Sequence, residues 1–102
     1  MVKATLIFSS KFFTIHKSLD LKAVVEMKIY QIPVSMDYPE RVKYSLFCID
    51  METNTIIVGF DNHRPKGHHV HINDEQNPYF FRGAQGLVDD FYTEIRRAGF
   101  EL

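Results

Sequence analysis

The chain has 102 residues, a formal net charge of −1 and a hydrophobic content of 45%. That length and that apolar content predict a single domain, residues 1–102, with a core of its own. They exclude an intrinsically disordered chain, and one cysteine excludes an internal disulfide framework. A near-neutral charge also argues against a protein that coats nucleic acid, although it allows a local basic site.

The compartment can be inferred from the cysteine content and from hydropathy. Cys48 has no partner for a disulfide, which favours a reducing environment. The apolar run at the N-terminus is too short for a signal peptide, and no segment approaches the roughly 20 apolar residues of a membrane span. We therefore expect a soluble cytoplasmic protein with no membrane partner.

The first 60 residues have the patterns of strands. Two short apolar runs, Ala4 to Phe8 and Lys11 to His16, predict two separate strands. Apolar and polar residues alternate from Ala23 to Ile32, which predicts a strand with one buried face. Arg41 to Asp50 and Thr55 to Phe60 are rich in β-branched and aromatic residues, and their short connection predicts an antiparallel hairpin.

The next segment holds four of the five histidines within nine residues, from His63 to His71. Pro65 and Gly67 predict a turn, after which His68 to Ile72 can form a short strand. Folding alone does not require such a cluster, so we place the candidate functional site here.

Alternation along this short strand divides its side chains between two faces. Val70 and Ile72 share a face with His68, whereas His69 and His71 share the opposite face. With the aliphatic residues pointing inward, the two histidines point outward together, and their Cα atoms are about 6.5–7 Å apart. His68 is then expected to be partly buried and hydrogen-bonded.

The last element is a helix from about Ala84 to Ala98. Apolar residues recur there at the three-and-four spacing of one buried stripe, and Gly99 is a good stop signal. The predicted fold class is α+β: a curved antiparallel β-sheet of about five or six strands, with one C-terminal α-helix packed on it.

Two chemistries fit the histidine segment, and the first is metal binding. His69 and His71 form a bidentate pair, and His63 could supply a third ligand to a divalent metal. An isolated His-x-His pattern is weak evidence, so the leading expectation is a site with no metal and no cofactor.

The second chemistry is metal-independent cleavage of a phosphodiester in RNA. His69 and His71 are the candidate acid and base, with His63 beside them and Asp61 to orient an imidazole. The candidate substrate-binding residues carry cationic, aromatic or amide groups: Arg64 and Lys66 at the phosphate, Tyr79 stacked on a base, and Asn62.

Several motifs resemble the TumE-like family of toxin–antitoxin modules. They are Gly59-Phe60-Asp61-Asn62-His63, His68-His69-Val70-His71-Ile72, Glu75-x-x-Pro78-Tyr79-x-Phe81 and Leu87-Val88-x-Asp90-Phe91. The resemblance spans about residues 20–98. It implies a small toxin encoded beside a DNA-binding antitoxin, which would be its protein partner.

The functional hypothesis is therefore a toxin-like protein that acts on RNA by histidine-dependent acid–base cleavage, as a ribonuclease. The alternative is a non-catalytic metal-binding or protein-interaction module that uses the same histidines. A homodimer is a further expectation, since an edge strand such as Ala4–Phe8 could pair with a second chain.

Overall fold

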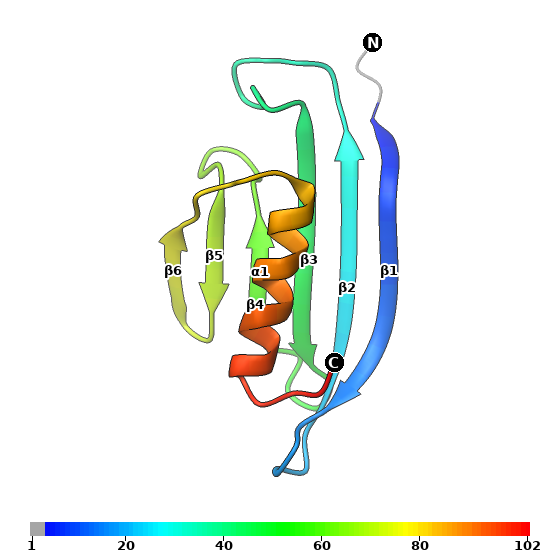
Figure 1. Ribbon diagram of the computed structural model, residues 1–102. Helices are drawn as coiled ribbons and strands as arrows, with labels where there is room; N and C mark the ends of the chain where they lie inside the picture. The colour runs from blue at the N-terminus through cyan, green and yellow to red at the C-terminus, as the bar shows by residue number, and fades with distance from the viewer. Residues whose placement is uncertain (1–3) are drawn as a thin grey trace.

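The computed structural model describes residues 4–102, in which a six-stranded antiparallel sheet carries one helix (Figure 1). Strand order follows chain order, so each strand pairs with its neighbours in the sequence. The elements are β1 (Thr5–Ile15), β2 (Lys22–Gln31), β3 (Val42–Asp50), β4 (Ile56–Asp61), β5 (His69–Ile72), β6 (Glu75–Pro78) and α1 (Ala84–Arg97). The predicted α+β class is confirmed.

The N-terminal part of the sheet differs from the prediction. Two separate strands, Ala4–Phe8 and Lys11–His16, were expected, and that prediction is wrong because β1 is one strand of 11 residues. Its pairing with β2 continues through Ser9 and Ser10. Backbone groups make the ladder, so two polar side chains between the apolar runs do not interrupt it.

The strand β6 was not predicted. Its four residues are all exposed, and none is apolar apart from Pro78, so neither alternation nor β-propensity indicates a strand. It forms because Asn73, at a φ of 53°, and Asp74 turn the chain back along β5. Two expected strands form the single strand β1, and β6 adds one, so the sheet has six strands, within the predicted five or six.

The helix α1 lies across one face of the sheet (Figure 1) and begins and ends within a residue of the prediction. Leu87, Phe91 and Ile95 form its fully buried stripe. They pack on side chains from β2, β3 and β4, which include Met27, Leu46, Cys48, Val58 and Phe60. Each of these residues except Cys48 contributes about 1.5–3 kcal/mol through burial. Within residues 4–102, no helix has the length and apolar character needed to cross a bilayer.

Alternate residues face away from α1 and form the open face of the sheet. In successive strands from β2 to β6, Glu26, Phe47, Gly59, His71 and Gln76 lie directly opposite one another. Residues opposite each other in an antiparallel pair project to the same side of the sheet. This row therefore crosses the open face and includes one of the clustered histidines.

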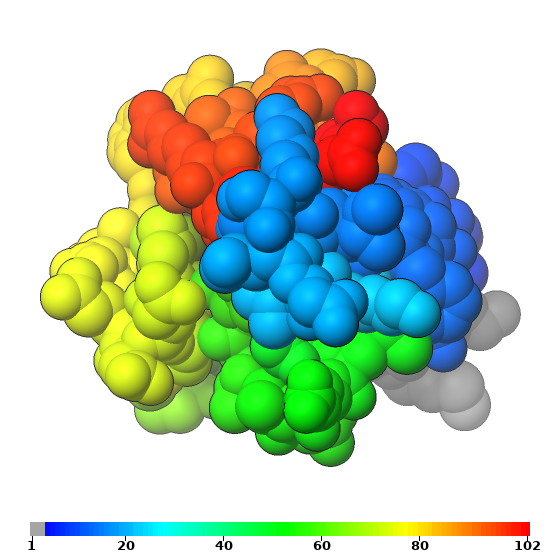
Figure 2. Space-filling model, turned by 90° about the horizontal axis from the view of Figure 1, so that it is seen from below, coloured from blue at the N-terminus to red at the C-terminus, as the bar shows by residue number. Residues whose placement is uncertain are grey.

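The chain after α1 is fastened to the β1–β2 hairpin. Gly99 follows the helix at a φ of 98°, and Phe100 is buried with its ring 5.2 Å from that of His16, edge to face. His16 in turn accepts hydrogen bonds at Nδ1 from the backbone N–H groups of Ser18 and Leu19. Figure 2 shows the hairpin (blue) beside the C-terminal residues (red). His16 therefore has a structural role.

We expect Gly99→Ala to destabilise the fold more than Gly67→Ala does. Both glycines have positive φ, 98° and 71°, and alanine at such an angle costs about 1–2 kcal/mol. A Cβ at Gly99 would also collide with Nε2 of His16, whereas one at Gly67 meets nothing within 4 Å. Urea unfolding of the two variants would measure the difference, and equal losses would contradict the proposed close approach at Gly99.

Candidate functional site

The pairing of β4 with β5 builds the candidate site. Asp61 is the last residue of β4 and lies directly opposite His69, the first residue of β5. The intervening turn is closed by a hydrogen bond of 3.2 Å from the N–H of Gly67 to the carbonyl of His63. The carboxylate of Asp61 also accepts the backbone N–H of His63 at 3.0 Å. Asp61 therefore stabilises the turn and faces an imidazole at the same time.

The ring of His69 is held at both nitrogens. Its Nδ1 lies 2.9 Å from the carbonyl oxygen of Gly67, and its Nε2 lies 3.2 Å from Oδ1 of Asp61. Both partners are acceptors, so the ring satisfies both contacts only when each nitrogen carries a hydrogen. Its side chain is 15% exposed. His69 is thus a mostly buried imidazole held between two acceptor oxygens.

His71 lies on the same face as His69 in different surroundings. The residue between them, Val70, is opposite the buried Phe60 and packs against the core, so the two histidines project away from the helix, as predicted. His71 is half-buried beside Gly59. Among residues 4–102, its ring has no hydrogen-bond or ion-pair partner. The ring nitrogens of His71 are therefore available to a ligand.

A lysine lies next to this pair. Nζ of Lys66 donates a hydrogen bond of 2.5 Å to Oε1 of Gln76, and Gln76 is directly opposite His71 in the β5–β6 pairing. A shallow groove runs along this edge and is lined by Lys66, His68, His69, Gln76, Asn77 and Pro78. Lys66 thus places one ammonium group at the border of this groove.

The remaining residues of the turn are exposed, and one of them has a partner. Arg64 forms an ion pair of 2.7 Å with Asp37, which ties the turn to the loop between β2 and β3. The side chain of His63 has no partner among the described residues. Phosphate binding by Arg64 and catalysis by His63 stay predictions.

His68 lies on the helix side of the sheet, as expected from the alternation. Its Nδ1 is 2.9 Å from the hydroxyl of Tyr44 and its Nε2 is 3.1 Å from Glu40. The ring stacks on Phe81 at 4.9 Å. Burial first, and then the nearby Tyr79 and two carboxylates, raise the pKa of Tyr44 far above its usual range. The phenol therefore stays protonated, and this network is structural.

Asn62 is 2% exposed and serves the backbone. Its Oδ1 accepts the N–H of Tyr44 at 3.0 Å, and its Nδ2 donates to the carbonyl of Val42 at 2.7 Å. β4 ends at Asp61, so the side-chain amide of Asn62 makes the hydrogen bonds to β3 that the backbone of a further β4 residue would make. Both of its polar ends are occupied, so substrate contact by Asn62 stays a prediction without geometric support.

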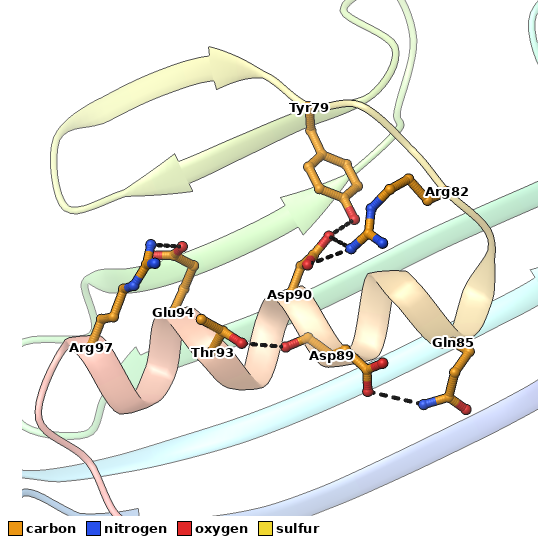
Figure 3. A network of polar contacts seen from close by, with 8 residues as sticks. All are labelled: Tyr79, Arg82, Gln85, Asp89, Asp90, Thr93, Glu94 and Arg97. Carbon is orange, nitrogen blue, oxygen red and sulfur yellow. Dashed lines mark hydrogen bonds and ion pairs between the residues drawn. The ribbon is translucent and has the colours of Figure 1, made fainter.

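Tyr79 points toward the helix rather than into the groove (Figure 3). Its hydroxyl donates to Asp90 at 2.5 Å, and the ring packs edge to face on Phe60 at 4.9 Å. Arg82 donates to both oxygens of the same carboxylate, at 2.7 and 2.8 Å. Burial and the hydrogen bond to Asp90 raise the pKa of Tyr79. This network fastens the β6–α1 connection, and base stacking by Tyr79 stays a prediction.

Two residues of the candidate site, Gln76 and Phe47, are not identifiable as such from the pattern of the sequence. Gln76 lies on the unpredicted β6, so its place opposite His71 could not be foreseen. Phe47 was assigned only to a strand, but its ring covers Gly59: a Cβ built on that glycine would lie 2.6 Å from Cε1 of the ring. A glycine inside a β-branched strand is the signal for such a close approach.

The metal interpretation has no geometric counterpart in the described residues. Within residues 4–102, no three side chains of His, Cys, Asp or Glu are grouped closely enough to hold a metal ion. The imidazole of His69, which the metal hypothesis needs as a ligand, has acceptors at both nitrogens.

Comparison with known proteins gives one match. The family model described as "Toxin TumE" matches residues 2–98, nearly the whole chain. No curated protein and no solved structure matches the chain.

The network in Figure 3 predicts a pH-dependent contribution to stability. Burial raises the pKa of Asp90, but hydrogen bonds from Tyr79 and Arg82 outweigh it and lower the pKa overall. A carboxyl with a lowered folded pKa stabilises the fold above its unfolded pKa, near 3.9, and this stabilisation is lost as pH falls through the folded value. We therefore expect Asp90→Asn to lower the free energy of unfolding near pH 7 and to change it much less near pH 2.

Urea titrations at the two pH values would measure this difference. Asp89→Asn is the matched control, because Asp89 is exposed and the side chain that it contacts is Gln85. It should change the stability little at either pH. A loss on Asp90→Asn that is the same at both pH values would contradict the charge-assisted role of this carboxylate.

Proposed function

This chain belongs to the TumE toxin family and is the toxin component of a toxin–antitoxin module, and we propose that it cleaves RNA through His69 and His71. Its protein partner is the cognate antitoxin. The proposal is carried by one observation. Two histidines share the open face of the sheet, one held between two acceptors and the other without a partner among residues 4–102.

Cleavage of RNA without a metal needs a base and an acid in opposite protonation states. The two histidines differ in their contacts, and this difference supports giving them the two roles. His71 is proposed to act as the base because its ring nitrogens have no partner among residues 4–102. His69 is proposed to act as the acid: its Nε2 would exchange the contact with Asp61 for the leaving oxygen, while the carbonyl of Gly67 holds Nδ1.

The proposed reaction is an internal transfer of the phosphoryl group. His71 takes the proton of a ribose 2′-hydroxyl, and the 2′-oxygen attacks the adjacent phosphorus. The bond between phosphorus and the 5′-oxygen breaks, and His69 gives its proton to that leaving oxygen. The products are a 2′,3′-cyclic phosphate and a free 5′-hydroxyl. His69 is left neutral and His71 cationic, and exchange with water restores both.

Two neighbouring groups suit the charge and the bases of RNA. Lys66 is held by Gln76 beside His71, where its ammonium can stabilise the charge that develops on the phosphate. Phe47 lies on the open face in the same row as His71, with Gly59 between them. An aromatic ring there can stack on an unpaired base. We assign this stacking role to Phe47, since Tyr79 is engaged with the helix.

We expect the double variant His69→Ala/His71→Ala to abolish growth inhibition when the protein is produced in cells without its antitoxin. Single replacements should each lower the rate of RNA cleavage by about 10²–10⁴-fold, the usual effect of losing a general acid or base. The measurements are growth after induction, and cleavage of a fluorescent RNA by purified protein. A 2′,3′-cyclic phosphate at the new end would identify the proposed reaction.

The control is the double variant Asp74→Ala/Glu75→Ala. It replaces two exposed residues at the β5–β6 turn and should leave toxicity and cleavage unchanged. Thermal unfolding would show that all variants fold. A folded His69→Ala/His71→Ala protein that remains fully toxic would overturn the site. Toxicity that needs the histidines, but with no RNA cleaved, would favour the alternative of a non-catalytic interaction module.

A further inference from the structure

The open face of the sheet extends well beyond the histidine segment. The one helix in the described part of the chain, α1, lies across the other face (Figure 1). Alternate residues of β2 and β3 are buried in the core on that side, at positions 23, 25, 27 and 29 and at positions 44, 46 and 48. Because side chains alternate along a strand, the residues between them project from the open face. They are residues 22, 24, 26, 28 and 30 of β2 and residues 43, 45, 47 and 49 of β3.

The charges on this face are mostly positive, although the whole chain has a net charge of −1. Its part on β1, β2 and β3 carries one acid, Glu26, and four lysines: Lys11, Lys22, Lys28 and Lys43. The other acid on the open face, Asp61, contacts His69. The remaining acids lie in loops, at strand ends or in α1. The open face therefore has the charge that attracts a polyanion.

The pairing of the strands places one of these lysines in the same row as a histidine. Lys28 lies opposite Ser45, and Ser45 lies opposite Asp61. Asp61 in turn lies opposite His69. Three strand spacings of about 4.8 Å, roughly 14 Å in total, therefore separate Lys28 from His69. The side chain of Lys28 is exposed, and its ammonium group has no ion-pair partner within residues 4–102.

Aromatic side chains on the same face accompany the lysines. The ring of Phe47 lies over Gly59, and Gly59 is directly opposite His71, so this ring lies between β3 and the histidine pair. Tyr30 is directly opposite Lys43 in the β2–β3 pairing. Rings beside cations are what proteins offer to a single-stranded nucleic acid, because bases stack on the rings and phosphates meet the cations.

We propose that the open face binds single-stranded RNA along a track that ends at the histidine pair. The track consists of four residues: Lys28, Lys43, Tyr30 and Phe47. This inference rests on the proposed cleavage of RNA and adds the form of its substrate, a single strand of about four nucleotides or more. A duplex fits less well, because its bases are stacked on one another and cannot stack on Phe47.

The first measurement is the salt dependence of binding. The probe is a fluorescent RNA of about 12 nucleotides with 2′-O-methyl riboses, which cannot be cleaved by the proposed internal transfer. Each phosphate contact contributes about −0.7 to the slope of log K against log salt for a single strand. Contacts by Lys28, Lys43 and Lys66 therefore predict a slope of about −2 for the wild-type chain. Lys28→Gln should reduce its magnitude by about 0.7.

Three further variants separate charge from stacking. Lys17→Gln is the matched control, because it removes the same charge from an exposed lysine in the β1–β2 connection and should change neither affinity nor slope. Glu26→Gln should raise the affinity, since it removes a negative charge beside Lys28. Phe47→Leu should lower the affinity about tenfold, as expected for one lost stacking contact, and leave the slope unchanged. Thermal unfolding would show that all variants fold.

Binding of the uncleavable probe separates the track from the proposed chemistry. Histidine-dependent cleavage of ordinary RNA, with a slope that Lys28→Gln does not change, would overturn the track and leave the chemistry standing. A slope reduced by Lys28→Gln in a chain that cleaves no RNA would support the track and reject the chemistry. A wild-type chain that does not bind the probe, or binds a duplex of the same length as tightly, would overturn the proposal. Loss of antitoxin affinity on Lys28→Gln, with RNA binding unchanged, would assign this face to the antitoxin instead.

Discussion

The register between β4 and β5 is the constraint on which the candidate site depends. It pairs Asp61 with His69 and, one residue on, Phe60 with Val70. A slip by one residue would turn Val70 to the solvent and His69 into the core, because side chains alternate along a strand. The burial of Phe60 under α1 therefore fixes the direction of the histidines. Packing on one face determines the chemistry available on the other.

Elements with strong periodicity were predictable, and those defined by pairing were not. The buried stripe of α1 and the outward direction of His69 and His71 follow from residue spacing. The unbroken β1 and the polar β6 do not, because hydrogen bonds to a neighbouring strand decide both. For the same reason the place of Gln76 could not be foreseen. The backbone role of Asn62 depends on a neighbouring strand as well, since its amide bonds to Tyr44 and Val42 of β3.

Three other groups that could react, Cys48, Tyr44 and Asp90, are withdrawn from chemistry at neutral pH. Burial raises the pKa of the Cys48 thiol to about 11, so almost none of it is thiolate. Tyr44 is buried and bonded to His68. Asp90 is engaged by Tyr79 and Arg82. His71 on the open face and the exposed His63, whose rings have no partner among residues 4–102, are more available to a ligand than these three groups.

The fastening of the chain end to β1 has a consequence for how the protein folds. Each strand pairs with its neighbour in the sequence, so the sheet can form from local contacts with little loss of loop entropy. The hydrogen bond between Thr14 and Glu101 instead spans 87 residues. Among the hydrogen bonds of residues 4–102 it closes the longest loop, and it requires α1 to be in place. The sheet is therefore expected to assemble first, with its apolar face exposed to water until the C-terminal segment docks.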